Sequence, residues 1–126
     1  MIGSVMLYAG SAIVIGWGIA HIAIPTKGVV KSFGPISTTN QRILLMEWVM
    51  EGVLLVFVGV LVALVRAIAP ETEVGPTVVY RTSAATLIIM AAISLATGAR
   101  TPIVPMKLCP LIFTAVALLF FLPTVM

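Results

Sequence analysis

The sequence predicts an all-α integral membrane protein whose single domain is a four-helix transmembrane bundle. Of its 126 residues, 61% are hydrophobic and only 9% are charged, and the mean hydropathy is +1.24. A soluble domain carries roughly 25% charged residues, so water is not the main solvent of this chain. The charges are also unevenly placed, because residues 1–26, 82–99 and 108–126 contain no Asp, Glu, Lys or Arg. These stretches have the length of about 20 apolar residues that a helix needs to cross a bilayer.

Four helices are expected along the domain 1–126, and prolines mark the ends of three of them. The predicted helices comprise residues 2–24, 41–68, 78–97 and 107–122. Pro25, Pro70 and Pro123 follow the first, second and fourth helices, and proline cannot continue a helix without losing a hydrogen bond. The loop 25–41 is expected to contain a short interfacial turn and to supply the N-cap of the second helix from its Ser-Thr-Thr-Asn segment.

The first helix has a spacing that is typical of closely packed membrane helices. Ala12, Gly16 and Ala20 recur every four residues, so we expect this face to approach a neighbouring helix. The helix begins without the basic residues of a signal peptide, and its apolar run exceeds the usual length of about 7–15 residues. We therefore expect this helix to be retained.

The distribution of Lys and Arg predicts the orientation and the partners. Five of the seven basic residues lie in or beside the loops 25–41 and 98–107, and the other two flank the remaining loop. Basic residues favour cytoplasmic loops, so both of these loops are expected in the cytoplasm and both termini outside, in a bacterial inner membrane. Seven dispersed cations do not form a nucleic-acid groove. The expected partners are membrane lipids and other membrane subunits or further copies of the chain.

Three ionisable residues lie within the predicted helices: His21 in the first, and Glu47 and Glu51 in the second. Each costs at least about 2.5–3.5 kcal/mol in a bilayer, which makes it a candidate for a functional site. The two helices are consecutive and antiparallel, so His21 and Glu47 can lie at similar depth. The glutamates are four residues apart and share one helix face. Trp17, one turn before His21, is expected to form a wall of the same pocket.

Such a pocket could exchange protons, bind a quinone-like headgroup or ligate a metal. Alternatively, these residues have only a structural role. His21 would then form a hydrogen bond to a loop carbonyl, and the glutamates would pair with cations or form hydrogen bonds across helices. The third helix adds a mild polar stripe at helical spacing, formed by Ser83, Thr86, Met90, Ser94 and Thr97.

The residue inventory excludes several cofactor sites. One histidine cannot supply two axial haem ligands, and no Glu-x-x-His pair of a di-iron bundle is present. Cys109 is the only cysteine and, with scattered methionines, does not predict a copper or zinc site. We therefore assign no catalytic residue and no metal ligand. The sequence requires no cofactor, although a quinone or a lipid is compatible with the pocket.

The first two helices resemble those of the DoxX-like group of small four-helix membrane proteins. The resemblance is carried by a glycine-rich first helix, a proline-bearing interfacial loop and the segment Glu-Gly-Val-Leu-Leu-Val-Phe-Val-Gly at residues 51–59. Some members of that group are subunits of thiosulfate:quinone oxidoreductases, so the resemblance implies a link to a quinone complex and a role for Glu51. The chain departs from the group in having no arginine at the start of the first helix, and in having His21 near a common lysine position.

These observations favour an accessory or binding subunit of a larger membrane complex, for which a redox- or quinone-linked complex is the expected kind. A small oligomeric proton-coupled transporter using Glu51 and Glu47 is the main alternative. A membrane-embedded isomerase with His21 and Glu47 as acid and base is a third possibility.

Overall fold

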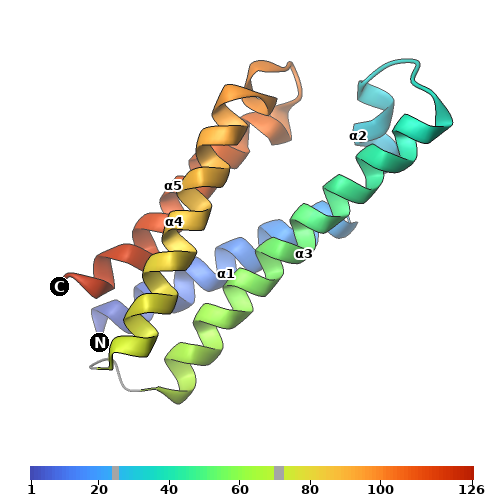
Figure 1. Ribbon diagram of the computed structural model, residues 1–126. Coiled ribbons are helices and arrows are strands. Elements are labelled where there is room, and N and C mark those ends of the chain that lie inside the picture. Colours follow the sequence, from blue (N-terminus) through green and yellow to red (C-terminus); the bar gives the residue numbers. More distant parts are fainter. Residues whose placement is uncertain (24–25, 70–72) are drawn as a thin grey trace.

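The protein is a bundle of helices arranged as two hairpins (Figure 1). The structure, a computed structural model, describes residues 1–23, 26–69 and 73–126. The helices are α1 (Ile2–Ala23), α2 (Thr26–Ser32), α3 (Thr38–Ile68), α4 (Val74–Ala96) and α5 (Val104–Phe121), with 3-10 turns η1 (Gly98–Arg100) and η2 (Leu122–Thr124). No strand occurs in these ranges. The predicted all-α fold is therefore confirmed.

Four of the helices, α1, α3, α4 and α5, are long and apolar enough to cross a membrane. In each, only 28% of the most apolar window is buried inside the protein. The rest of the surface carries large apolar side chains such as Phe57, Leu64, Ile89 and Leu111. Exposed apolar faces of this extent require lipid as their solvent. The chain is a multi-pass membrane protein.

Two helices begin earlier than the sequence predicts. The Oγ of Ser37 accepts a hydrogen bond from the backbone N–H of Asn40 at 3.2 Å, so α3 begins at Thr38, three residues before the expected start. The next long helix, α4, begins at Val74 and not at residue 78, because Pro76 fits within a first helical turn. Pro25 and Pro70, which were expected to end the first two helices, lie outside the described residues.

The expected interfacial turn is a short helix, α2. It is followed by Gly34, whose φ of 76° lies in the left-handed region that suits glycine. The residue before it, Phe33, is 36% exposed. This turn of the chain lets α3 re-enter the membrane beside α1.

Glycines bring α1 and α3 into backbone contact. A Cβ added to Gly18 would lie 2.6 Å from the carbonyl oxygen of Gly52. One added to Gly59 would lie 2.6 Å from the side chain of Ile15 and 2.9 Å from the carbonyl oxygen of Ser11. These approaches exclude any larger residue at the two positions, and they fix the register of α1 on α3.

The predicted contact face of the first helix is not the face that packs against α3. Ala12 is exposed, and a Cβ added to Gly16 would meet no atom within 4 Å. The buried face instead contains Val14, Gly18 and His21. A small-residue spacing shows that a close approach is possible, but the face that is used depends on the glycines of the partner helix.

The two hairpins, α1 with α3 and α4 with α5, meet near the chain termini and diverge toward the other end of the bundle (Figure 1). Near the termini, Gly10 of α1 lies so close to Phe120 of α5 that an added Cβ would be 2.8 Å from the ring. Arg66 donates to the Oγ of Ser4 at 2.7 and 3.1 Å, which ties α3 to α1 at this end. Toward α2 and η1, the divergence leaves room for a cavity.

Candidate functional site

His21 is the most buried ionisable side chain among the described residues, with 2% of its surface exposed. Its Nδ1 lies 3.0 Å from the carbonyl oxygen of Trp17, one turn earlier in α1. A carbonyl can only accept a hydrogen bond, so Nδ1 carries a proton. The other ring nitrogen, Nε2, is buried and has no hydrogen-bond partner within the described part of the chain.

Two indole rings hold the imidazole of His21 in place. Trp48 of α3 stacks on it, with ring centroids 4.5 Å apart and an interplanar angle of 24°. Trp17 meets it edge-on, at 5.5 Å and 67°. Together with the Nδ1 hydrogen bond, these contacts fix the direction in which Nε2 points. Trp48 was not among the predicted site residues, although it lies three residues from Glu51 and therefore on a neighbouring part of the same face.

Glu51 is the carboxylate that faces Nε2. Its Oε1 lies 3.9 Å from Nε2 of His21, which is beyond hydrogen-bond distance, and 31% of its side chain is exposed. Glu47 is exposed and forms no ion pair with His21 in the described ranges. The register set by Gly18 and Gly52 therefore places His21 beside the second glutamate and not beside the first. This geometry gives no support to an acid–base pair formed by His21 and Glu47.

Cys109 joins this pair from α5. It is 5% exposed, and its thiol donates to the carbonyl oxygen of Pro105 at 3.4 Å. One donor atom each of His21, Glu51 and Cys109 lie within 4.8 Å of one another. Cys109 was not expected to be a metal ligand, because it is the only cysteine and lies 88 residues from the histidine in sequence. Their proximity arises only when α5 packs against the first hairpin.

A cavity of about 660 Å³ opens beside these residues, between α3 and the α4–α5 hairpin. It runs along α3 from Leu44 to Leu54, which is about 15 Å at 1.5 Å per residue. Its apolar lining includes Phe33, Met50, Leu54, Met90, Ile93 and Met106. Its polar lining includes Glu47, Glu51, Ser94, Thr97 and Cys109. Part of the predicted polar stripe of the third helix thus reaches the cavity, while Ser83 is buried elsewhere.

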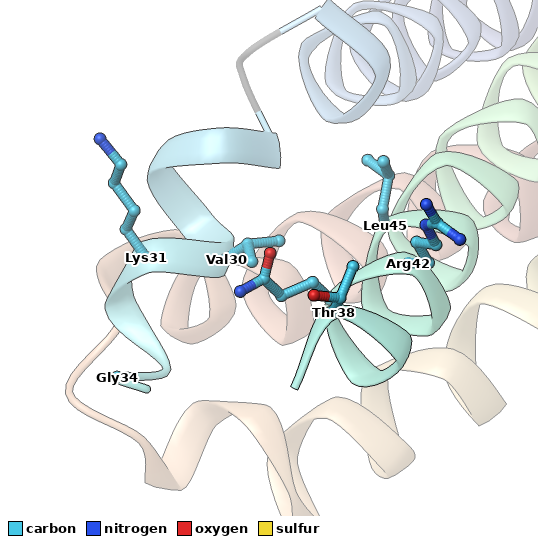
Figure 2. Close-up of a pocket in the computed structure, with 7 residues that line it drawn as sticks. Val30, Lys31, Gly34, Thr38, Arg42 and Leu45 are labelled. Carbon is cyan, nitrogen blue, oxygen red and sulfur yellow. The ribbon is translucent and has the colours of Figure 1, made fainter. Parts of the chain in front are cut away.

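A second pocket, of about 480 Å³, lies between α2 and the start of α3 (Figure 2). In Figure 2, Lys31 extends away from the other labelled side chains, whereas Arg42 lies beside Leu45 on α3. Neither cation is ion-paired within the described residues. A basic surface at the end of a membrane bundle is typical of contact with anionic lipid headgroups.

Comparisons with models of protein families, with curated proteins and with solved structures gave no match to this chain.

Proposed function

We propose that this chain is a membrane-embedded binding subunit that holds an amphipathic molecule, a quinone or a lipid, in the cavity between its two hairpins. The observation that carries the proposal is the cavity itself. It is mostly apolar, it lies along the membrane-spanning part of α3, and it has Glu51 in its wall. Ligand pockets characteristically combine apolar walls with a few polar groups that fix orientation.

The arrangement suits a molecule with one polar end. A headgroup hydroxyl can donate to the carboxylate of Glu51, and the hydroxyls of Ser94 and Thr97 lie in the same cavity wall. The apolar part would then lie along Leu54 and Met90. Burial of that part supplies most of the affinity, at about 25 cal/mol per Å² of apolar surface.

Two further observations support a subunit over an independent enzyme. Almost all of the described chain belongs to helices or the short connections between them, so catalytic residues outside the membrane have little room. The DoxX-like resemblance around Glu51 points in the same direction, toward a quinone-linked complex in a bacterial inner membrane. In this proposal the loops 25–41 and 98–107 are cytoplasmic and both termini are outside.

Quinone quenching of tryptophan fluorescence tests the binding function. The chain has two tryptophans, so Trp17→Phe leaves Trp48, in the cavity wall, as the single fluorophore. A short-chain ubiquinone, titrated into this variant in detergent with EDTA present, should quench saturably. Adding Glu51→Gln should weaken binding about tenfold, since hydrogen bonds to charged groups contribute roughly 1.5–3 kcal/mol.

The control is Glu73→Gln, an exposed glutamate at the other end of the bundle, which should leave the titration unchanged. A quench that rises linearly with quinone, and that Glu51→Gln does not alter, would show simple partitioning into micelles and would contradict the proposal.

Isolation from native membranes tests whether the chain is a subunit of a larger complex. Stoichiometric partner subunits are expected, and a homogeneous lone chain would count against a complex.

The contact between His21 and Glu51 favours one alternative, a proton-coupled transporter. A carboxylate that faces both an imidazole and an open cavity can exchange a proton between them. In proteoliposomes, this function requires a substrate-dependent proton flux that Glu51→Gln abolishes. A flux that persists in Glu51→Gln would remove the role.

A further inference from the structure

The donor atoms of His21, Glu51 and Cys109 converge from three different helices, α1, α3 and α5. They are a nitrogen, an oxygen and a sulfur, and each can offer a lone pair to a metal ion. An intramembrane cluster of this kind is costly without compensation, because buried polar groups need partners. The packing nevertheless brings them to within 4.8 Å of one another.

Nε2 of His21 is the observation that separates this cluster from a chance gathering. The ring is 2% exposed, and Nδ1 is protonated because it donates to the carbonyl of Trp17. In the neutral ring, Nε2 therefore carries the lone pair, and it has no hydrogen-bond donor near it in the described part of the chain. Metal-binding histidines are typically oriented in this way, with the second nitrogen bonded to a carbonyl or a carboxylate.

The spacing of the three atoms is close to that of a coordination site. An ion placed equally far from three atoms that are at most 4.8 Å apart would be at most about 2.8 Å from each, against about 2.0–2.3 Å for zinc with these donors. A contraction of at most roughly 0.5–0.8 Å per ligand closes the difference. Glu51 can supply much of it, because 31% of its side chain is exposed and it lines an open cavity.

We propose that His21, Glu51 and Cys109 form a binding site for a divalent zinc-like ion inside the membrane. Nε2, a carboxylate oxygen and the thiolate are its three protein ligands. A three-ligand zinc site keeps a fourth position open, and here that position faces the cavity, since Glu51 and Cys109 both line it. Thiolate and carboxylate together balance the charge of the ion, so the occupied site is neutral and suited to an apolar environment.

Binding of the ion must release the thiol proton of Cys109 to solvent, which gives up its hydrogen bond to Pro105. The site goes beyond the binding of a quinone or lipid and does not depend on it. An ion there would also place a Lewis acid next to the polar end of any molecule in the cavity.

Cobalt(II) is the probe, because it substitutes for zinc and reports its ligands by absorption. The full chain, in detergent and freed of metal by EDTA and dialysis, is titrated with Co²⁺ in the absence of quinone. We expect one equivalent to bind, with a near-ultraviolet thiolate-to-cobalt charge-transfer band and the intense visible bands of a tetrahedral ion. Zn²⁺ should displace the cobalt and abolish both signals.

Two nearly isosteric variants keep the test independent of folding. Cys109→Ser should remove the charge-transfer band, and each of Cys109→Ser and Glu51→Gln should weaken Zn²⁺ binding by more than about 100-fold, because loss of an outer-shell partner alone costs 10–100-fold. Glu73→Gln, remote from the site, should bind as the wild type does. Near-ultraviolet circular dichroism confirms that each variant is folded.

Absence of the thiolate band, or equal Zn²⁺ affinity in the wild type and both variants, would overturn the proposal. Because the quinone titration contains EDTA and the cobalt titration contains no quinone, either proposal can fail while the other stands.

Discussion

At the scale of single residues, glycine sets the geometry on which the site depends. Gly18 and Gly52 allow the backbones of α1 and α3 to touch, and this contact places Glu51 opposite Nε2 of His21. Without it, the helices would separate by the width of a side chain. The 3.9 Å contact between the two ionisable groups would then be lost. The contact between His21 and Glu51 therefore depends on two glycines that have no reactive side chain.

Two Gly→Ala substitutions in α1 test this reasoning. In Gly18→Ala the new Cβ would lie 2.6 Å from the carbonyl oxygen of Gly52, so the helices must move apart. Overpacking of this kind costs about 1–3 kcal/mol. Gly16→Ala meets no atom within 4 Å and should be neutral or stabilising by up to about 1 kcal/mol, because alanine favours helix.

The measurement is unfolding of the purified protein in mixed micelles as the SDS fraction rises. Equal midpoints for the two variants would show that the approach of α1 to α3 is not a determinant of stability.

At the scale of helices, the divergence of the two hairpins creates the cavity. The hairpins are held together near the termini, where Gly10 of α1 packs on Phe120 of α5. Within the second hairpin, Arg81 of α4 donates to the side-chain and backbone oxygens of Thr124, just after α5, at 3.0 and 3.1 Å. At the opposite end α3 and α4 separate, and the cavity occupies that space. Its walls are therefore formed by different hairpins, so that a ligand bound there would bridge them.

Two Leu→Phe substitutions on α3 distinguish the cavity from the lipid-facing surface. Leu54 lines the cavity and is 42% exposed, whereas Leu64 is 57% exposed and lies ten residues later, away from it. Leu54→Phe should weaken quinone quenching of Trp48 by about tenfold, because the larger ring occupies space that the ligand needs. Leu64→Phe should not change it. If both variants bind quinone as well as the parent protein, the ligand does not occupy this cavity.

At the scale of the whole molecule, the four long helices place α2 and η1 at one end and both termini at the other (Figure 1). The two basic residues nearest the termini end, Arg66 and Arg81, are used in hydrogen bonds within the protein. The other end carries Lys31, Arg42 and Arg100 on an exposed surface. Within the described residues these three cations have no ion pair, and cations of this kind respond to headgroup charge, which supports the proposed cytoplasmic position of that end.

Single cysteines in a Cys109→Ser background report this topology. Thr39→Cys lies in the first turn of α3 and Pro102→Cys in the loop before α5, both at one end of the bundle, and Glu73→Cys lies just before α4 at the other end. With a membrane-impermeant maleimide, the first two should label only in inside-out vesicles and the third only in right-side-out vesicles. Labelling of Thr39→Cys and Glu73→Cys from the same side would contradict a four-crossing topology.

Much of this architecture could be predicted from the sequence, because a bilayer imposes simple rules. Charge-free stretches of sufficient length must form helices, since only a helix satisfies its own backbone in hydrocarbon. The same rule made His21 and Glu51 stand out, because ionisable residues in such stretches are rare. Composition and spacing were enough for both conclusions.

Only the tertiary structure decided which of these residues meet. Helix periodicity identifies residues on one face but does not give the register between two helices, so the sequence left both Glu47 and Glu51 as candidates, and the structure places Glu51 beside His21. The sequence also could not reveal the role of Cys109, because the contact of α5 with the first hairpin joins residues far apart in the chain. The membrane therefore determined the helices, and close packing through glycine determined the site.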